Sequence, residues 1–147
     1  MNIAYFIRPK KLIKYLRDDH TFRQGLEKMR HHGFTAIPVI DREDHYVGTV
    51  SQSDFLGQLL DTDSKHLSVH SLKELEHLNI RDIMQPDLYP PVRITVTMGE
   101  LVNSAMNQNF IPVVDDLGNF VGIVTRKDIM RYFSEQSYRD ALLSKII

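Results

Sequence analysis

The sequence predicts a mixed α/β (α+β) fold in which two β-α-β-β-α units pack as a pseudo-twofold pair. The first observation behind this prediction is a repeat: residues 33–54 read GFTAIPVIDREDHYVGTVSQSD, and residues 109–128 read NFIPVVDDLGNFVGIVTRKD. Pro38 and Pro112 occupy matching places in the two copies and lie 74 positions apart (112 − 38). Because two copies are too few for a solenoid, the repeat favours a paired module. Short apolar runs and helix-capping patterns define the elements of each copy.

Each copy contains two predicted strands. Short runs rich in Val and Ile cover residues 35–40 and 46–50 in the first copy, and residues 110–114 and 120–124 in the second. Runs of this length between polar turns are typical of buried strands, and the five-residue loops predict hairpins. The proline inside the first strand of each pair cannot donate a ladder hydrogen bond. It therefore predicts an edge or a gap in pairing, where backbone groups are free to meet a ligand.

A hydroxyl residue and, three positions later, a carboxylate end each copy: Ser51 with Asp54, and Thr125 with Asp128. Apolar residues at helical spacing follow both pairs, so the pattern is that of a capping box. A carboxylate at a helix start can also accept both hydrogen bonds of a ribose diol, and the hydroxyl and free amides there suit a phosphate. The presence of the same device in both copies favours ligand binding, and both interpretations stay open.

The segment before the first hairpin completes the first unit. Residues 10–16 suit a short strand or an extended lead-in. Thr21 and Gln24 form a capping-box pattern, and Gly33 is a good residue to follow a helix end, so a helix is predicted between them. Residues 61–70 are polar and predict a loose connection to the second unit.

The second unit is predicted in the same way. Ser71 and Glu74 indicate the start of a short helix, and three prolines between residues 86 and 91 favour extended chain. Residues 92–96 are predicted to form a strand, and Thr97 is expected to cap the helix that follows.

The two copies resemble CBS domains, a family named after cystathionine β-synthase, in the tandem arrangement called a Bateman module. The family's motifs are G-h-[ST]-x-x-P and G-h-x-[ST]-x-x-D, where h is apolar. Residues 33–38 match the first motif, and residues 48–54 match the second except at Thr49, where an apolar residue is usual. Residues 122–128 match the second motif fully, whereas asparagines replace the Gly and Ser/Thr of the first motif in the second copy. The resemblance divides the chain into a first repeat, 1–70, and a second repeat with a C-terminal helix, 71–147.

The resemblance implies a stand-alone regulatory module that binds an adenosine-containing ligand in clefts between the paired repeats. The ligands it implies are AMP, ADP, ATP, S-adenosylmethionine or a cyclic dinucleotide such as cyclic di-AMP. Asp54 and Asp128 would hold ribose hydroxyls, with Ser51 and Thr125 near ribose or phosphate. Strand backbone and apolar lead-ins would hold the base, through Tyr15, Leu16, Thr35, Ala36, Ile37, Pro38, Val92, Asn109, Phe110, Ile111 and Pro112.

Arg126 and Lys127 lie inside the second hydroxyl–carboxylate motif. They are natural phosphate contacts if a nucleotide binds there, and otherwise a solvated basic pair. The first copy has Gln52 and Ser53 in these places, so the two halves are predicted to be chemically unequal.

The output of such a module would be a ligand-dependent change of shape offered to an effector protein. Residues 134–147 keep apolar side chains on roughly one face, and a helix of that length needs packing to persist, so the tail is expected either to pack on its own module or to contact a partner. Because CBS modules commonly pair, the resemblance implies a homodimer. The alternative from another class is a structural or dimerisation module with empty clefts. A weaker alternative is an enzyme of a kind that the motifs do not reveal.

The composition argues against several other classes of partner and chemistry. The chain has 147 residues, 18 Lys and Arg against 19 Asp and Glu, a formal net charge of −1 and no cysteine. No large basic field is present, so nucleic acid is not an expected partner. Without cysteine there is no disulfide, thiol nucleophile or thiolate metal site. The sequence shows neither an apolar run of membrane-spanning length nor a signal peptide, so no membrane partner is predicted and a cytoplasmic protein is the simplest expectation.

No metal or catalytic site is predicted. His66 and His70 stand four positions apart, but no third ligand accompanies them. The sequence has no nucleophile elbow, no phosphate-binding P-loop and no dinucleotide Gly-rich turn. We therefore expect no enzyme activity, and no cofactor apart from a regulatory adenine nucleotide bound as a ligand.

Overall fold

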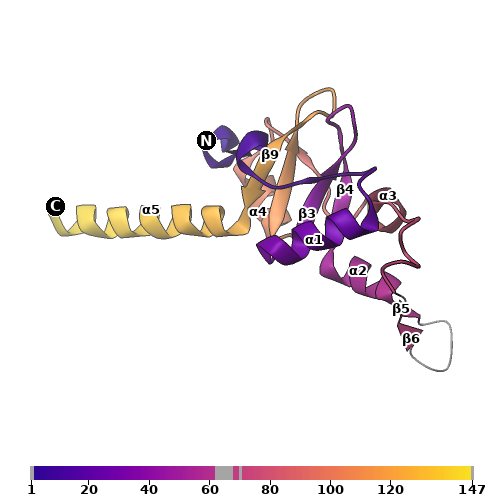
Figure 1. Cartoon of the computed structure of the whole chain (residues 1–147). Coiled ribbons are helices and arrows are strands. Elements are labelled where there is room, and N and C mark those ends of the chain that lie inside the picture. The colour runs from indigo at the N-terminus through magenta and orange to yellow at the C-terminus, as the bar shows by residue number, and fades with distance from the viewer. Residues whose placement is uncertain (1, 62–67, 70, 147) are drawn as a thin grey trace.

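The computed structural model describes residues 2–61, 68–69 and 71–146 and contains two main sheets with helices around them (Figure 1). Each half of the chain follows the order strand, helix, hairpin, helix, which confirms the predicted α/β fold. The elements of the first half are β2 (Leu16–Arg17), α1 (Phe22–His32), β3 (Ala36–Ile40), β4 (Tyr46–Ser51) and α2 (Gln52–Leu59). Those of the second half are β7 (Val92–Arg93), α4 (Met98–Ala105), β8 (Phe110–Val114), β9 (Phe120–Thr125) and α5 (Arg126–Ile146).

The predicted capping signals form as expected. The side chain of Thr21 accepts the N–H of Gln24, whose own side chain accepts the N–H of Thr21, and Gly33 ends α1 in the left-handed conformation (φ 67°). Thr97 begins α4 with the same reciprocal bonds. These signals are local, so they act wherever the surrounding chain places the helix.

The two hairpins have the same register. Pro38 lies opposite Thr49 in the first hairpin, and Pro112 lies opposite Ile123 in the second, 74 positions further along in both strands (123 − 49). In each half a short parallel strand pairs with the end of the first hairpin strand: β2 with β3, and β7 with β8.

The halves meet along a pseudo-twofold axis. The backbone N–H of Tyr46 donates to the carbonyl of Gly118, and the N–H of Phe120 donates to the carbonyl of Asp44, so the two bonds are exchanged between matching positions. The rings of Tyr46 and Phe120 stack with centroids 6.1 Å apart. Only residues on or beside an axis can contact their own equivalents, so these bonds locate the axis at the hairpin ends.

The lead-in of each half packs on the opposite half. The 3-10 helix η1 (Ile3–Phe6) and strand β1 (Arg8–Pro9) lie against the second repeat, where β1 pairs with β9. Helix α3 (Ile80–Ile83) lies against the first repeat, and Gln85 forms an isolated bridge to Thr49 of β4. The boundary predicted near residue 70 therefore divides the sequence, while the packing crosses it in both directions.

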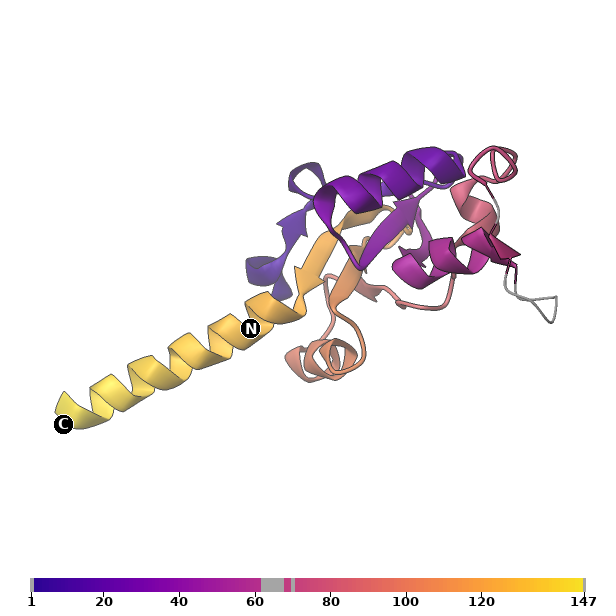
Figure 2. The ribbon, with the colours of Figure 1, turned by 60° about the horizontal axis from the view of Figure 1, so that its bottom comes forward.

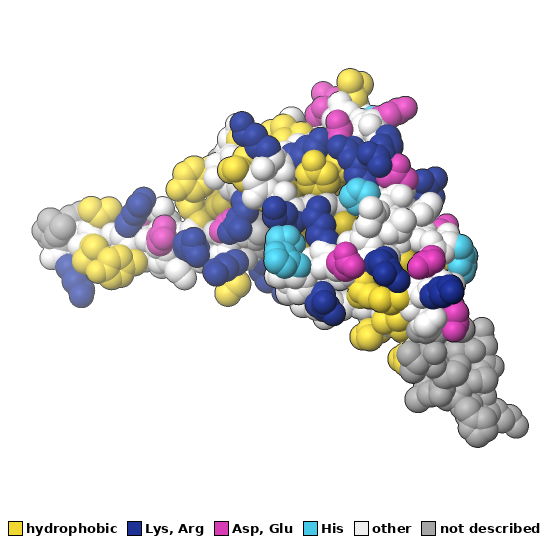
Figure 3. Space-filling view, viewed as in Figure 1, with side chains coloured by type: hydrophobic (Ala, Val, Ile, Leu, Met, Phe, Trp, Pro, Cys, Tyr) yellow, Lys and Arg dark blue, Asp and Glu magenta, His cyan; other side chains and the backbone are white. Residues whose placement is uncertain are grey.

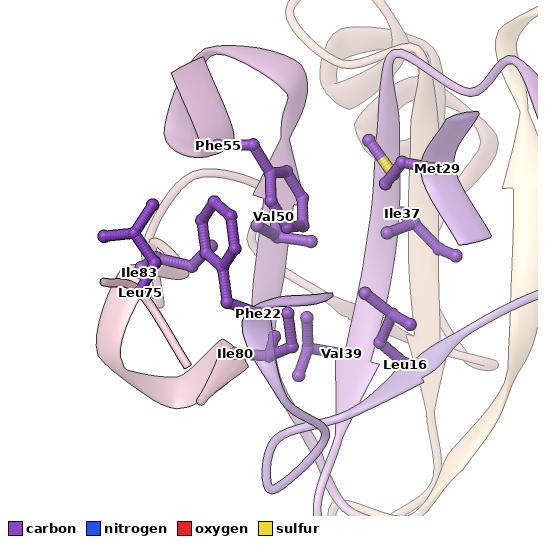
Figure 4. Packing of buried hydrophobic residues seen from close by; sticks show 10 residues of the cluster. All are labelled: Leu16, Phe22, Met29, Ile37, Val39, Val50, Phe55, Leu75, Ile80 and Ile83. Carbon is purple, nitrogen blue, oxygen red and sulfur yellow. The ribbon is translucent and has the colours of Figure 1, made fainter. Parts of the chain in front are cut away.

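Two hydrophobic cores result from this exchange. The first holds Phe22 and Phe55 with their rings 5.2 Å apart, and the crossing residues Ile80 and Ile83 close it, as Figure 4 shows. The second core contains Ile3 and Phe6 from the N-terminal segment, packed among residues of α4, β8, β9 and α5.

Three predicted elements differ in the structure. The helix predicted after Ser71 is a series of turns over residues 72–77, which place Leu75 in the first core. The strand predicted for residues 92–96 is shortened to Val92–Arg93, because the chain turns directly afterwards. Within residues 10–16 the chain forms the 3-10 helix η2 (Lys10–Leu12) before β2 begins at Leu16.

The connection between the halves is described only at its ends. Strand β5 (Leu60–Asp61) pairs antiparallel with β6 (Ser68–Val69). Most of the loose connection predicted for residues 61–70, together with His66 and His70, lies outside the described residues.

Helix α5 extends well beyond the rest of the molecule, as Figures 1 and 2 show from two directions. Tyr138 and Leu142, two residues of the predicted apolar face, are exposed on this projecting part.

Candidate functional site

A crevice of about 310 Å³ lies between the two repeats and is the best candidate for a binding site. We call it the open crevice. Most of its walls are apolar, with a few polar and two cationic groups among them, which is the usual composition of a small-molecule site. Its lining residues are Arg8, Leu12, Ile13, Lys14, Phe34, Ala36, Ile37, Pro38, Asn109, Phe110, Ile123 and Thr125.

The open crevice combines one motif from each repeat. Ala36 and Pro38 come from the intact strand motif of the first repeat, and Thr125 comes from the intact hydroxyl–carboxylate motif of the second. Sequence reasoning found these two motifs to be the better preserved of each kind but could not pair them. The structure places residues of both motifs in the lining of one crevice.

The wall formed by β3 has a free backbone edge. Strand β2 pairs with β3 only at Val39 and Ile40, so it does not reach Ala36 or Pro38 on that edge. The proline therefore costs no ladder hydrogen bond, as the sequence predicted. Backbone groups at this edge are available to a planar ligand.

Asp128 lies beside the open crevice, in an ion pair that the sequence did not reveal. Its Oδ2 accepts the Nε–H of Arg8 at 2.7 Å and its Oδ1 accepts an Nη2–H at 2.9 Å, so the contact is bidentate. The Arg8 side chain is 47% exposed and that of Asp128 19% exposed. The Arg8 hydrogen bond, followed by smaller contributions including Thr125, lowers the pKa of Asp128, and it raises the pKa of Arg8. Asp128 is therefore a carboxylate with both oxygens already bonded.

Arg8 forms part of a second, smaller hollow of about 260 Å³, which Asp128 also lines. We call this the Asp128 hollow. Arg8 lines both the open crevice and the Asp128 hollow, so its side chain stands between the ribose-binding carboxylate proposed from sequence and the crevice.

Asp54, the equivalent carboxylate of the first repeat, has a neutral partner. Its Oδ1 accepts the side-chain amide of Gln85 at 2.5 Å, and its Oδ2 accepts the N–H and the hydroxyl of Ser51 at 2.8 and 3.0 Å. Gln85 pairs with Thr49 as Arg8 pairs with Ile123, so Gln85 and Arg8 hold equivalent places. Asp54 thus forms the capping box that its sequence pattern indicates.

The position equivalent to the open crevice on the other side of the axis is filled. Gln108, which matches Phe34 after a shift of 74 (108 − 34), is only 5% exposed and donates to the carbonyls of Phe110 and Pro90. Thr49, which matches Ile123, is fully buried and its hydroxyl lies 2.7 Å from that of Tyr46. The side chains of Gln108 and Thr49 are thus both buried and hydrogen-bonded to neighbouring groups, so this side is a structural contact.

Six of the predicted binding residues line the open crevice: Ala36, Ile37, Pro38, Asn109, Phe110 and Thr125. Others lie close to it without lining it. Thr35 directly precedes β3 and is exposed, and its carbonyl accepts the N–H of Gln52. Asp128 is separated from the open crevice by its ion-pair partner Arg8. Ser51 and Asp54 belong to the filled side.

The remaining predicted residues are placed elsewhere. Leu16 and Ile111 are fully buried in the two cores, and Pro112 and Val92 pack within the second sheet. Lys127 is exposed. Arg126 donates to the carbonyl of Ala105 and to the side chain of Asn109, and it faces the groove between α4 and α5. One of these bonds holds Arg126 beside Asn109, a lining residue of the open crevice, and the phosphate contact suggested by its sequence position stays a prediction.

Sequence reasoning missed half of the lining: Arg8, Leu12, Ile13, Lys14, Phe34 and Ile123. The sequence does contain a pattern that could have identified Arg8. Arg8-Pro9 and Gln85-Pro86 both place a polar residue before a proline at the start of a lead-in, which marks them as equivalent.

Tyr15, another predicted contact, lies in a cationic surface and not in the crevice wall. Its ring centroid is 5.7 Å from the ammonium groups of Lys10 and Lys28 and 5.8 Å from the guanidinium of Arg17. Figure 3 shows Lys and Arg side chains gathered over the middle of this face. With Lys14 and Arg8 at the crevice itself, the surroundings favour an anionic ligand.

Other chemistry finds no support in the described part of the chain. Residues 2–61, 68–69 and 71–146 contain no group of three or more His, Cys, Asp or Glu side chains placed to hold a metal ion. Within the same residues, no helix combines the length and the hydrophobicity that crossing a bilayer requires.

Comparison with known proteins identifies the repeat. Residues 9–61 and 80–135 each match the family model of the CBS domain. The chain belongs to the CBS-domain family. This confirms the resemblance inferred from the duplicated motifs, and the two matched regions correspond to the two CBS repeats of the fold.

Relatives and solved structures agree with this. An uncharacterised protein of Methanocaldococcus jannaschii is 31% identical over 114 residues, which cover 72% of this chain and 38% of that protein. The CBS-domain chain thus spans well under half the length of that relative, and 49% of a second one from Methanopyrus kandleri.

Two solved structures share the whole fold. The CbpB protein of Listeria monocytogenes in complex with c-di-AMP superposes with a TM-score of 0.81 at 22% identity, covering 92% of this chain and 97% of that one. CBSX2 in complex with AMP gives a TM-score of 0.70 at 23% identity, covering 92% and 98%. The arrangement of two CBS repeats is therefore shared with both.

Proposed function

We propose that this chain is a non-catalytic regulatory module that binds an adenosine-containing ligand in the open crevice and signals its occupancy to a partner protein. The observation that carries the proposal is the composition of the crevice. The free edge of β3 and the apolar walls suit a planar base, Thr125 and Asp128 suit a sugar, and Arg8 and Lys14 suit phosphate. The complexes of two structural neighbours with c-di-AMP and AMP support the choice of ligand class.

The asymmetry of the two sides supports the binding of one ligand per chain. The counterpart of the open crevice is occupied by the buried side chains of Gln108 and Thr49, which are bonded to neighbouring groups. A ligand there would have to break these bonds and leave buried polar groups without partners, which costs free energy.

Thermal unfolding with AMP, ADP, ATP, S-adenosylmethionine and cyclic di-AMP tests the proposal. A ligand at a hundred times its dissociation constant adds about 2.7 kcal/mol of stability. We expect a rise in melting temperature with at least one of them and a calorimetric stoichiometry near one. If no compound shifts the transition, the chain is a structural module. Conversion of ATP to products by the purified chain would instead indicate an enzyme.

The variant Ala36→Phe tests whether the ligand binds in the open crevice, which Ala36 lines. The equivalent residue of the second repeat is Phe110, which is only 7% exposed and whose ring packs against Tyr89, so the fold already accepts a phenyl ring at this register position. A phenyl ring at position 36 is expected to fill the open crevice and abolish the ligand-induced shift. The melting temperature without ligand serves as the control for folding.

We also propose a homodimer formed through the helices. A groove of about 800 Å³ between α4 and α5 is lined mainly by apolar groups, and Met130 and Phe133 on it are 64% and 44% exposed. Leu56 and Leu59 line a matching groove of about 360 Å³ between α1 and α2 of the first repeat, 74 positions earlier (130 − 56). Two like faces on one chain can pair with the same faces of a second copy in an isologous contact.

Sedimentation equilibrium tests this assembly. The wild-type chain is expected to be dimeric at micromolar concentration. The double variant Leu56→Asp, Met130→Asp is expected to be monomeric with an unchanged circular dichroism spectrum. A monomeric wild-type chain would contradict the proposal, leaving the ligand site unaffected.

A further inference from the structure

The ion pair between Arg8 and Asp128 occupies the groups that a ribose would need. Both oxygens of the carboxylate accept bonds from the same guanidinium, at 2.7 and 2.9 Å. A ribose diol that binds Asp128 must donate to those two oxygens, so it competes directly with Arg8.

A displaced Arg8 would face a crevice that already carries positive charge. The residues lining the open crevice include two cations, Arg8 and Lys14, and no carboxylate. If a neutral sugar took Asp128, the guanidinium would lose its charged partner and remain beside Lys14. An anion within the crevice would restore a charge-assisted pair.

We propose that Arg8 makes the open crevice selective for phosphorylated ligands. The ribose hydroxyls replace the Arg8 guanidinium as hydrogen-bond donors to Asp128, and the released guanidinium then donates to the phosphate of the same ligand. The inference rests on the proposed function and adds the residue that would make the site prefer a ribonucleotide to a nucleoside, namely Arg8. A nucleoside can perform only the first half of the exchange, and it supplies no anion to Arg8 within the open crevice, whose lining contains no carboxylate.

The first repeat supplies an internal comparison. Gln85 holds the equivalent place and binds Asp54 through a neutral amide. Arg8→Gln therefore copies a residue that the fold already accepts at the matching position. Arg42 also forms an ion pair, donating its Nε–H to Asp19 at 2.5 Å, and its side chain is 65% exposed. Because this pair lies outside the crevice lining, Arg42→Gln is the matched control for loss of an arginine.

Titration calorimetry with AMP and adenosine tests the exchange in the wild type, Arg8→Gln and Arg42→Gln. The wild type is expected to bind AMP at least about tenfold more tightly than adenosine, because a charge-assisted bond to a partly exposed group is worth roughly that factor. In Arg8→Gln the ratio is expected to fall towards one, with adenosine binding more tightly than to the wild type. Arg42→Gln is expected to retain the wild-type ratio.

A second measurement needs no variant. The Nε–H resonance of Arg8 is expected to move when AMP saturates the wild-type chain, since its acceptor changes from carboxylate to phosphate. An unmoved resonance at saturation would overturn the exchange.

The outcomes separate this inference from the proposed function. If the wild type binds AMP and adenosine equally, or if Arg8→Gln weakens both without changing their ratio, nucleotide binding stands and the role of Arg8 is overturned. If the wild type binds no adenosine compound at all, the proposed function fails and the inference fails with it.

Discussion

Tyr46 and Phe120 are equivalent residues of the two repeats, and their rings stack on one another with centroids 6.1 Å apart. The pair lies on the pseudo-twofold axis, yet its two members differ in chemistry. The hydroxyl that only Tyr46 carries donates to the carbonyl of Tyr89 at 2.8 Å and lies 2.7 Å from the hydroxyl of Thr49. The backbone around the axis is therefore symmetric, whereas the side-chain hydrogen bonds are not. These hydrogen bonds lie on the side of the axis that Gln108 and Thr49 fill.

Removal of that hydroxyl should destabilise the chain. Tyr46→Phe keeps the ring stack but leaves the buried Thr49 hydroxyl and the Tyr89 carbonyl without this partner, at a cost of about 1–2 kcal/mol. Urea unfolding followed by circular dichroism measures the loss. Tyr138→Phe, on the exposed part of α5, should change the free energy of unfolding by less than about 0.5 kcal/mol. Equal effects of the two variants would contradict the structural role of the Tyr46 hydroxyl.

The two carboxylates should contribute differently to binding. Asp128→Ala is expected to weaken AMP binding by roughly ten- to a hundredfold, because it removes the acceptor for the ribose beside the open crevice. Asp54→Ala is expected to leave AMP affinity within about twofold, and to lower stability by about 1 kcal/mol through loss of the α2 cap. Calorimetry and urea unfolding of the same two variants supply both numbers. A larger effect of Asp54→Ala on binding would place the ligand on the other side of the axis.

The stabilising effect of the Arg8–Asp128 pair should depend on pH. The Arg8 hydrogen bond lowers the pKa of Asp128 below its ordinary value of 3.8, so the unfolded chain binds this proton more readily than the folded one. The pair therefore stabilises the fold above that ordinary value, and its contribution disappears as the pH falls through the lowered pKa. Because Arg8 is half exposed, the effect should not exceed about 1 kcal/mol at low salt.

The free energy of unfolding of the wild type minus that of Arg8→Gln measures this contribution. The difference should be positive at pH 7, shrink in acid and decrease with added salt. A difference that does not change with pH would show that the variant acts through packing and not through the ion pair.

Gly122 should be intolerant of a side chain. A Cβ atom there would overlap the carbonyl oxygen of Arg8 in the paired strand β1, and backbone cannot move aside as a side chain can. Gly122→Ala is expected to cost about 1–3 kcal/mol and to loosen the N-terminal segment. Hydrogen exchange of residues 3–9 and urea unfolding together test both expectations.

Gly57→Ala is the control for this substitution. Nothing lies within 4 Å of the Cβ position at Gly57 in α2, so alanine should stabilise the helix by roughly 0.5–1 kcal/mol. A Gly122→Ala variant as stable as the wild type would mean that β1 does not pack closely on β9.

The sequence predicted what short-range chemistry determines. The apolar runs, the Thr21 and Thr97 caps and the Gly33 helix end depend on residues within a few positions of one another, and all are present. The helix predicted at Ser71 is absent because few residues separate it from the cap at Asn79, too few to offset the cost of nucleating a helix while Leu75 enters the core.

The site was less accessible from sequence because it depends on long-range packing. Arg8 and Asp128 are 120 positions apart, and nothing local to either indicates the contact. The presence of Pro38 and Thr125 in the lining of one crevice likewise follows from how the repeats pair. The position of Arg126 in the motif suggested a phosphate contact, but it did not indicate the bonds that its side chain donates to the carbonyl of Ala105 and to the side chain of Asn109.

The exchange of lead-ins has a consequence for synthesis on the ribosome. The first hydrophobic core needs Ile80 and Ile83, so the amino-terminal half cannot finish folding until the start of the other half has emerged. Ile3 and Phe6 are buried later still, because the residues that cover them include Leu101, Val113 and Ile129. Ile3 and Phe6 are thus translated before the residues that bury them, and until those residues emerge their apolar side chains are exposed to chaperones and to other nascent chains.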